Sequence, residues 1–179
     1  MIVAYAADAQ FPDLSWLDVE QAFFLQDGVT LGERLVRAFD WAFARGARRA
    51  AALGSDAPAL QAGWIREGLE VLGSRDLVLG PTHDGGYHLI GMTMLRPSLF
   101  EGMPWSSPFL LQRTLEQARR LNLSVRQLNA IADLDTPEDL RAFAGEPMLE
   151  HMTSRTAHWL RRLRPLSPEA SASKSRAQR

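Results

Sequence analysis

The sequence predicts an α/β fold built on a mostly parallel sheet, and three observations support this prediction. Short apolar segments alternate along the chain with longer segments whose apolar residues recur at helical spacing. Clusters of Gly, Pro and Asp separate these segments, as they do at turns. The hydrophobic content of 46% in 179 residues is enough to build one buried core. Alternation of this kind is typical of strands joined by helical crossovers, which make neighbouring strands parallel.

Each predicted element follows from its local pattern. The strands are continuous short apolar runs bounded by turn residues, and they cover 2–6, 20–26, 49–53, 76–79, 87–91 and 124–128. The helices carry apolar residues on one face, and they are expected at 31–45, 58–72, 108–121 and 149–163, with a further helix opening at Thr136 and a helical turn at 97–100. The segment around residues 11–17 is expected to be a loop or a short helix, and residues 167–179 to be disordered.

Composition and charge exclude several classes of protein. The net charge of -1 combines +6 from residue 155 onward with -7 over the first 154 residues. A body this acidic is a poor nucleic-acid platform, because phosphate neutralisation needs clustered cations. No apolar run reaches the length of a membrane span, and the residues 1–7 fit a strand better than a signal peptide. The absence of cysteine suits a reducing, cytoplasmic setting.

Three polar clusters follow predicted strands: Gly54-Ser55-Asp56, His83-Asp84-Gly85-Gly86 and Asp133-Leu134-Asp135. In a parallel sheet the carboxyl ends of the strands form one edge, where ligands bind. Carboxylates gathered there suit a hard divalent cation such as Mg²⁺ or Mn²⁺, which prefers oxygen ligands. Such a cation would neutralise charge on a diphosphate leaving group.

Each of these residues also has a structural explanation. Asp56 fits a helix cap as well as a metal ligand, and Asp84-Gly85 is a common turn pair. For Thr136 and Asp139 a capping box is the favoured interpretation, and Asp133 and Asp135 taken alone fit solvated turn acids. Two histidines, His83 and His88, are too isolated to indicate ligands, and Trp105 fits a core or pocket-wall aromatic residue.

The order of the motifs along the chain strengthens the prediction of a metal site, because it resembles that of a known family. The chain contains Leu31-Gly-Glu-Arg34, Gly54-Ser-Asp-Ala-Pro58, the run from Leu79 to Gly91, Pro104-Trp-Ser-Ser-Pro108, and Asp133-Leu-Asp-Thr-Pro-Glu-Asp-Leu140. From about residue 1 to 143 it resembles the bacterial GT-A-like glycosyltransferases labelled radical-SAM/selenodomain-associated transferase type 1, of the nucleotide-diphospho-sugar transferase superfamily. That family is distantly similar to the molybdenum-cofactor and phospholactate guanylyltransferases.

The resemblance implies a Rossmann-like GT-A three-layer sandwich and a role for each motif. Asp56 is expected to hold the divalent cation against a nucleotide diphosphate, with Asp135 and Asp133 as the late acids near the metal. Asp84 is expected to orient or deprotonate an acceptor hydroxyl, and Gly85 and Gly86 to approach the acceptor or sugar. The substrate-binding residues expected by similarity also include Arg34, Trp105 and Ser106, although Arg34 fits a surface ion pair equally well.

The chain departs from the family in lacking the first strand and its nucleotide-binding loop of the Pro-Gly-x-x-Lys-Thr-Arg-Leu type. We therefore expect an N-terminally truncated transferase domain over residues 1–146, an amphipathic helix over 147–164 and a disordered basic tail over 165–179. Smaller departures are Thr30 and Ala57, in place of an acid and a cysteine. Without the first strand, the edges of its neighbours would be exposed, and the helix 149–163 or a homodimer would have to cover them. The explanation that we favour for the missing strand is a wrongly assigned start codon.

Two classes of function follow. The first is metal-dependent transfer of a glycosyl group from a nucleotide sugar to an acceptor, with nucleotidyl transfer as a close variant that the sequence does not separate. The second is a non-catalytic remnant or partner-binding domain, supported by the missing loop.

Overall fold

The computed structural model describes residues 2–5, 22–152 and 154–163. The strands are β1 (Ile2–Tyr5), β2 (Ala22–Leu25), β3 (Ala50–Leu53), β4 (Leu77–Pro81), β5 (Tyr87–Met92) and β6 (Val125–Gln127). The helices are α1 (Leu31–Ala44), α2 (Ala62–Val71), α3 (Leu110–Arg120), α4 (Pro137–Gly145) and α5 (Arg155–Leu163), with 3₁₀ turns η1 (Pro97–Leu99) and η2 (Pro147–His151). The expectations for residues 11–17 and 167–179 lie outside the described residues. None of the described helices is long and apolar enough to cross a bilayer.

The main sheet is mixed, and its strand order is β3-β5-β4-β6. β5 is antiparallel to both of its neighbours, while β4 and β6 are parallel. Strands β3, β4 and β6 therefore share one direction, and only β5 departs from the predicted parallel sheet. The reason is the short connection 82–86 between β4 and β5, because a parallel crossover needs a dozen or more residues. β1 and β2 pair in parallel as a separate two-stranded sheet.

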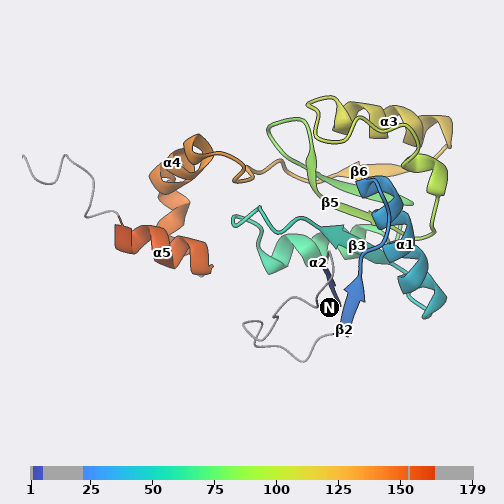
Figure 1. Ribbon diagram of the computed structural model, residues 1–179, viewed down its shortest axis with the longest axis horizontal. Coiled ribbons are helices and arrows are strands. Elements are labelled where there is room, and N and C mark those ends of the chain that lie inside the picture. The colour runs from blue at the N-terminus through green and yellow to red at the C-terminus, as the bar shows by residue number, and fades with distance from the viewer. Residues whose placement is uncertain (1, 6–21, 153, 164–179) are drawn as a thin grey trace, which may run out of the picture.

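The main sheet carries helices on both faces, and Figure 1 shows α2 and α3 on opposite sides of it. Successive residues of a strand point to opposite faces, so the fully buried β4 contributes to two cores. Leu77 and Leu79 pack on the side of α1 and α3, while Val78 packs on the side of α2. The larger core contains Phe39, Leu77, Leu79, Ile90, Met92, Leu99, Phe100 and Ala118, and the smaller one Leu72, Val78 and Leu89.

Helix α1 begins where its capping residues place it. The Thr30 hydroxyl accepts a hydrogen bond from the Glu33 amide at 3.2 Å, and the Glu33 carboxylate accepts one from the Val29 amide at 2.7 Å. The first bond satisfies an amide that the first turn leaves free, and the second ties the residue before the cap to that turn. Thr30, a departure from the family pattern, therefore works as a helix cap.

Helix α2 begins at Ala62 and not near Pro58, as the sequence predicts. Gln61 is its N-cap, and Pro58 and Ala59 form a turn. The shift has a packing reason, because Ala59 is buried in a third core formed with the C-terminal helices. The possibility that Asp56 caps this helix is wrong, since the cap lies five residues further along the chain.

The C-terminal helices form a unit at the end of the molecule opposite α1 (Figure 1). Helix α4 opens with the predicted capping box between Thr136 and Asp139. The single helix predicted over 149–163 is instead the 3₁₀ turn η2 followed by α5, because Met152 has an extended backbone with ψ 141°. The core of this unit contains Ala59, Phe143, Leu149, Met152, Ala157 and Leu160.

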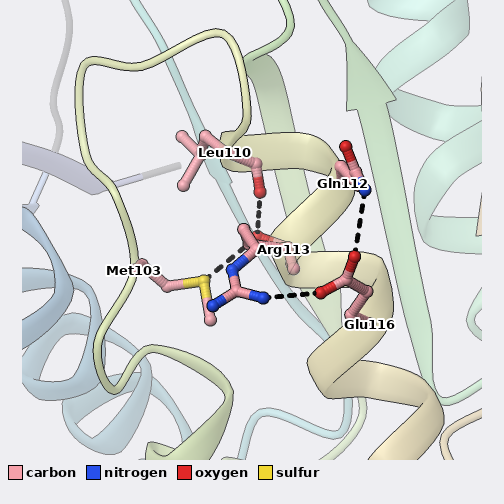
Figure 2. A network of polar contacts seen from close by, with 6 residues as sticks. Met103, Leu110, Gln112, Arg113 and Glu116 are labelled. Atoms are coloured by element: carbon pink, nitrogen blue, oxygen red, sulfur yellow. Dashed lines mark hydrogen bonds and ion pairs between the residues drawn. The ribbon is translucent and has the colours of Figure 1, made fainter.

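Helix α3 is tied to the loop before it by a short polar network, shown in Figure 2. The Thr114 hydroxyl donates to the Leu110 carbonyl at 2.9 Å and lies 3.7 Å from the Met103 sulfur. On the solvent side Arg113 and Gln112 both donate to Glu116, at 2.8 and 3.0 Å, and these bonds lower the pKa of Glu116. The exposed pairs lie within the helix and contribute little stability, so in this network the contact of the buried Thr114 with Met103 is the one that joins α3 to the preceding loop.

The central role of β4 predicts the effect of truncating it. Leu79→Ala removes a fully buried side chain, 0% exposed, and should lower the free energy of unfolding by about 2–5 kcal/mol in urea titrations. Leu53→Ala on β3, where the side chain is 40% exposed, is the control and should cost less than about 1 kcal/mol. Equal losses would contradict a core centred on β4.

Candidate active site

The acidic residues predicted to form a site lie at one edge of the main sheet. Asp56 follows β3, Asp84 follows β4, and Asp133 and Asp135 follow β6. Because these three strands run in the same direction, their carboxyl ends meet at that edge. The antiparallel β5 contributes its start to the same edge, through the 82–86 turn.

The structure brings three of these carboxylates together. One oxygen from each of Asp84, Asp133 and Asp135 lies within 4.8 Å of the others. Asp84 and Asp135 are exposed, and Asp133 is half-buried. We refer to these three residues as the acidic triad.

Asp84 is positioned by its own turn. Its Oδ1 accepts hydrogen bonds from the Thr82 hydroxyl at 2.5 Å and from the Gly86 amide at 2.9 Å. Thr82 is only 5% exposed, so this anchor is fixed in the body of the protein. Gly85 has φ +91°, and a Cβ on it would lie 2.1 Å from the Pro108 carbonyl oxygen. The turn therefore requires glycine at position 85. Both hydrogen bonds to the Asp84 carboxylate use Oδ1, so within the described residues Oδ2 remains available to a ligand.

Main-chain hydrogen bonds hold the loop that carries Asp133 and Asp135. The Ile131 amide donates to the Pro81 carbonyl at 3.1 Å, and the His83 amide donates to the Ile131 carbonyl at 3.2 Å. On the other side the Leu134 amide donates to the Asp56 carbonyl at 2.9 Å. The loops after β3, β4 and β6 are therefore joined to one another.

The electrostatics of the triad are uncompensated. Partial burial raises the pKa of Asp133, and the negative charges of Asp84, Asp135 and Asp56 raise it further. A raised pKa means that the protein disfavours the ionised carboxylate at this position. No ion pair in the described part of the chain involves these acids. A cation at this point would relieve the repulsion.

Asp56 lies beside the triad but outside it. Its carboxylate is folded over Gly54, where an added Cβ would lie 2.6 Å from its Oδ1. Its charge acts on both Asp133 and His88. Asp56, the first residue that the resemblance implies as a metal ligand, is thus the one acid of the four that lies outside the group.

The other predicted substrate-binding residues lie around the start of α1 and the loop before α3. Arg34 donates from Nε to the Gly28 carbonyl at 3.0 Å, and within the described residues its terminal nitrogens have no partner. The Trp105 indole packs on Gly32, where an added Cβ would lie 3.0 Å from its Cζ2, and it stacks on Phe100. Ser106 is exposed and holds the left-handed conformation at φ 56°. No hydrogen bond in the described structure joins these residues to the triad.

His88, which is too isolated in the sequence to indicate a ligand, lies near the site. It is 3% exposed, and neither ring nitrogen has a hydrogen-bond partner among the described residues. Burial lowers its pKa, while the charge of Asp56 raises it. A cavity of about 10 Å³, near the minimum that holds one water, is lined by Trp64, Glu67, His88, Leu128 and Asn129.

A larger cavity of about 50 Å³ lies at the opposite edge of the sheet, with Asp76 and Arg96 in its lining. The Asp76 carboxylate in this lining already has partners, because its Oδ2 accepts hydrogen bonds from the Ser124 amide at 2.8 Å and the Ser124 hydroxyl at 2.6 Å. These bonds lower the pKa of Asp76. Asp76 therefore fastens β4 to β6, and we place the candidate site at the acidic edge.

The sequence did not single out Thr82 or the Leu134–Asp56 link, although both position the triad. A threonine in a predicted loop gives no sign of burial, and a main-chain bond between loops leaves no residue pattern. Thr82 does lie inside the Leu79–Gly91 run, which was selected as a whole.

Comparisons with known proteins concern the family and the fold of the chain. The model of family DUF2064, described as "Uncharacterized protein conserved in bacteria", matches residues 1–107. The fold is similar to the crystal structure, at 1.90 Å resolution, of a protein from Desulfovibrio desulfuricans G20 described as a "putative nucleotide-diphospho-sugar transferase". That match has a TM-score of 0.83 and 33% sequence identity, and it covers 92% of this chain and 74% of the other. No match was found among curated proteins.

The turn geometry predicts that Gly85→Ala damages the site. Both Gly85 and Gly102 have positive φ, but only Gly85 faces a carbonyl oxygen where a Cβ would lie, since Gly102 opens on empty space. Gly85→Ala should therefore lower the unfolding free energy by about 2 kcal/mol or more, against about 1 kcal/mol for Gly102→Ala. Equal effects in denaturant titrations would show that backbone strain alone, and not the Pro108 contact, fixes this turn.

The buried His88 predicts a pH dependence of stability. Its lowered folded pKa means that the unfolded chain binds the proton more readily, so stability is present above about pH 6.5 and lost as pH falls below it. His88→Leu should weaken this loss, by up to about 1.4 kcal/mol per pH unit, in denaturant titrations between neutral pH and pH 5. If the unfolding free energy of the variant depends on pH as that of the parent protein does, His88 is not a neutral imidazole that burial keeps from binding a proton.

Proposed function

The chain belongs to the bacterial family DUF2064, and we propose that it is a metal-dependent transferase that moves a glycosyl group from a nucleotide diphosphate sugar to an acceptor hydroxyl. Its α/β fold with a mixed sheet is transferase-like, and 33% identity over 92% of the chain supports carrying the substrate class across. The acidic triad is the observation that carries the proposal.

The triad suits a divalent cation in its donor chemistry. Three carboxylates offer oxygen ligands, which Mg²⁺ and Mn²⁺ prefer over nitrogen or sulfur. The loops that carry them are held by main-chain bonds, so the negative charges are kept together despite their repulsion. The raised pKa of Asp133 supports the same assignment, since a cation would stabilise its ionised form.

The geometry favours Asp84 as a ligand over the base that the resemblance implies. One of its carboxylate oxygens belongs to the same group as those of Asp133 and Asp135. A carboxylate beside a cation has a lowered pKa and is a poor acceptor for a hydroxyl proton. Asp56 lies one step away, within electrostatic range of Asp133, and would reach the cation by turning its side chain off Gly54.

The remaining groups act on the substrate. A bound cation would stabilise negative charge on the diphosphate leaving group. Arg34 uses Nε to hold the Gly28 carbonyl, and its terminal N–H groups remain to contact a phosphate. Gly85 and Gly86 hold the turn that presents Asp84, and by similarity this turn would approach the acceptor or sugar. Trp105, beside the start of α1, and the exposed Ser106 would contact the substrate on the same basis.

Nucleotidyl transfer is the second candidate, because the same cluster would serve attack at phosphorus. The reaction products separate the two. Incubation of the protein with Mn²⁺, a panel of nucleotide sugars and a simple alcohol acceptor should release a nucleoside diphosphate. Release of pyrophosphate from nucleoside triphosphates with a sugar phosphate would instead assign nucleotidyl transfer. No product with any donor, in a protein that binds none of them, would leave the non-catalytic interpretation.

Metal binding predicts a matched pair of variants. Mn²⁺ with a bound nucleotide sugar should raise the unfolding free energy by about 2.7 kcal/mol at roughly a hundred times the dissociation constant. Asp133→Asn should abolish this gain, yet leave the metal-free protein at least as stable, because it removes a carboxylate whose pKa is raised by partial burial and by its acidic neighbours. Asp40→Asn on α1, an exposed acid without a hydrogen-bond partner in the described structure, is the control and should keep the gain.

Thermal unfolding with and without Mn²⁺ measures both effects. If the Asp133→Asn and Asp135→Asn proteins both still gain stability from Mn²⁺, the triad is not the metal site and the proposal loses its main support.

A further inference from the structure

Helix α5 presents a stripe of basic and aromatic side chains to solvent. Arg155, His158, Trp159 and Arg162 are all exposed, and Trp159 is 52% exposed. They are spaced at i, i+3, i+4 and i+7, so they share one face of the helix. The opposite face buries Ala157 and Leu160 in the C-terminal core. We refer to the four exposed residues as the α5 stripe.

The stripe does not serve the fold. Arg161, which is outside it, donates to the carbonyls of Leu149 and Met152 and so fastens α5 to η2. By contrast, no side chain of Arg155, His158 or Arg162 makes a hydrogen bond or ion pair within the described structure. Helix α5 contains no acidic residue that could neutralise them. The indole of Trp159 and the side chains around it are therefore available to an external partner.

The charge of the whole chain points the same way. From residue 155 onward the sequence has seven basic residues against the single acid Glu169, whereas the first 154 residues carry a net charge of -7. An anionic surface would therefore attract the segment of the chain that includes α5 and repel the acidic remainder.

We propose that the α5 stripe docks the protein on an anionic lipid surface. Arg side chains near such a surface gain from its negative potential, and the amphipathic indole of Trp159 partitions to the headgroup level. A nucleic acid fits less well, because single strands are bound by several aromatic side chains along a basic groove and the stripe carries one on a helix face. Since the apolar face of α5 is used in the core, the attachment is peripheral, reversible and sensitive to salt.

The helix that carries the stripe is connected to the acidic edge of the sheet through the C-terminal core. Leu134, between the triad residues Asp133 and Asp135, packs against the same core as Leu160 of α5. The C-terminal unit that would contact the lipid is therefore joined directly to the acidic edge of the sheet. The docking itself does not depend on the proposed function and is tested by binding alone.

Co-sedimentation of the full chain with vesicles tests the proposal. Vesicles containing phosphatidylglycerol should bind the protein about tenfold or more tightly at low salt than vesicles of phosphatidylcholine alone, with the difference lost at high salt. Arg155→Glu with Arg162→Glu should weaken binding to the anionic vesicles about tenfold or more. Trp159→Ala should weaken it about threefold or more.

The matched control is Arg66→Glu with Arg126→Glu, which changes the net charge equally at two exposed arginines on α2 and β6. This variant should bind within about twofold of the parent protein. An equal loss in stripe and control variants would show that only net charge matters and would overturn the proposal. Equal binding to both kinds of vesicle, or binding to a single-stranded oligonucleotide without binding to vesicles, would overturn it as well. The side chains of Arg155, His158 and Arg162 make no hydrogen bond or ion pair within the described structure, so thermal unfolding should show that all variants are folded.

Discussion

Main-chain hydrogen bonds between three loops hold the acidic edge of this protein together. The Ile131 amide bonds to the Pro81 carbonyl, the His83 amide to the Ile131 carbonyl, and the Leu134 amide to the Asp56 carbonyl. Side chains could not supply this cohesion, since the carboxylates carried by these loops repel one another and raise the pKa of Asp133. The backbone therefore fixes an arrangement that its own side chains oppose, and the strands behind it must be rigid enough to sustain it.

That rigidity comes from β4. Every residue of this strand is buried, and its alternating side chains belong to the cores on both faces of the sheet. The strand leads directly into Thr82, which is buried and fixes the carboxylate of Asp84. The free energy gained by burying apolar side chains on β4 thus offsets the cost of gathering acids at its end. A separate core around Leu149 supports the loop on the other side, because Leu134 packs against it.

The same organisation explains how one chain combines an acidic face with a basic end. The triad lies on loops between the main sheet and the C-terminal unit, and α5 carries its unpaired arginines on the outer surface of that unit. A cation bound at the triad would neutralise part of the local negative charge, while the arginines of the α5 stripe remain available to an external anionic surface. The two features are joined through a core of six buried residues and do not compete for the same side chains.

Much of the local structure was determined by the sequence itself. Helical spacing located α1 and α3, the Thr136–Asp139 pair predicted its capping box, and the order of the acidic motifs identified the edge where a site would form. These signals are local, because a helix face or a cap depends on residues a few positions apart. Tertiary structure alone decided that β5 runs antiparallel and that α2 starts at Ala62. It also decided that His88 is buried without a hydrogen-bond partner among the described residues, and that Asp84, not Asp56, joins Asp133 and Asp135. These features depend on which distant segments pair and on the direction in which a side chain leaves its loop. The spacing of residues along the chain encodes neither the pairing nor the direction.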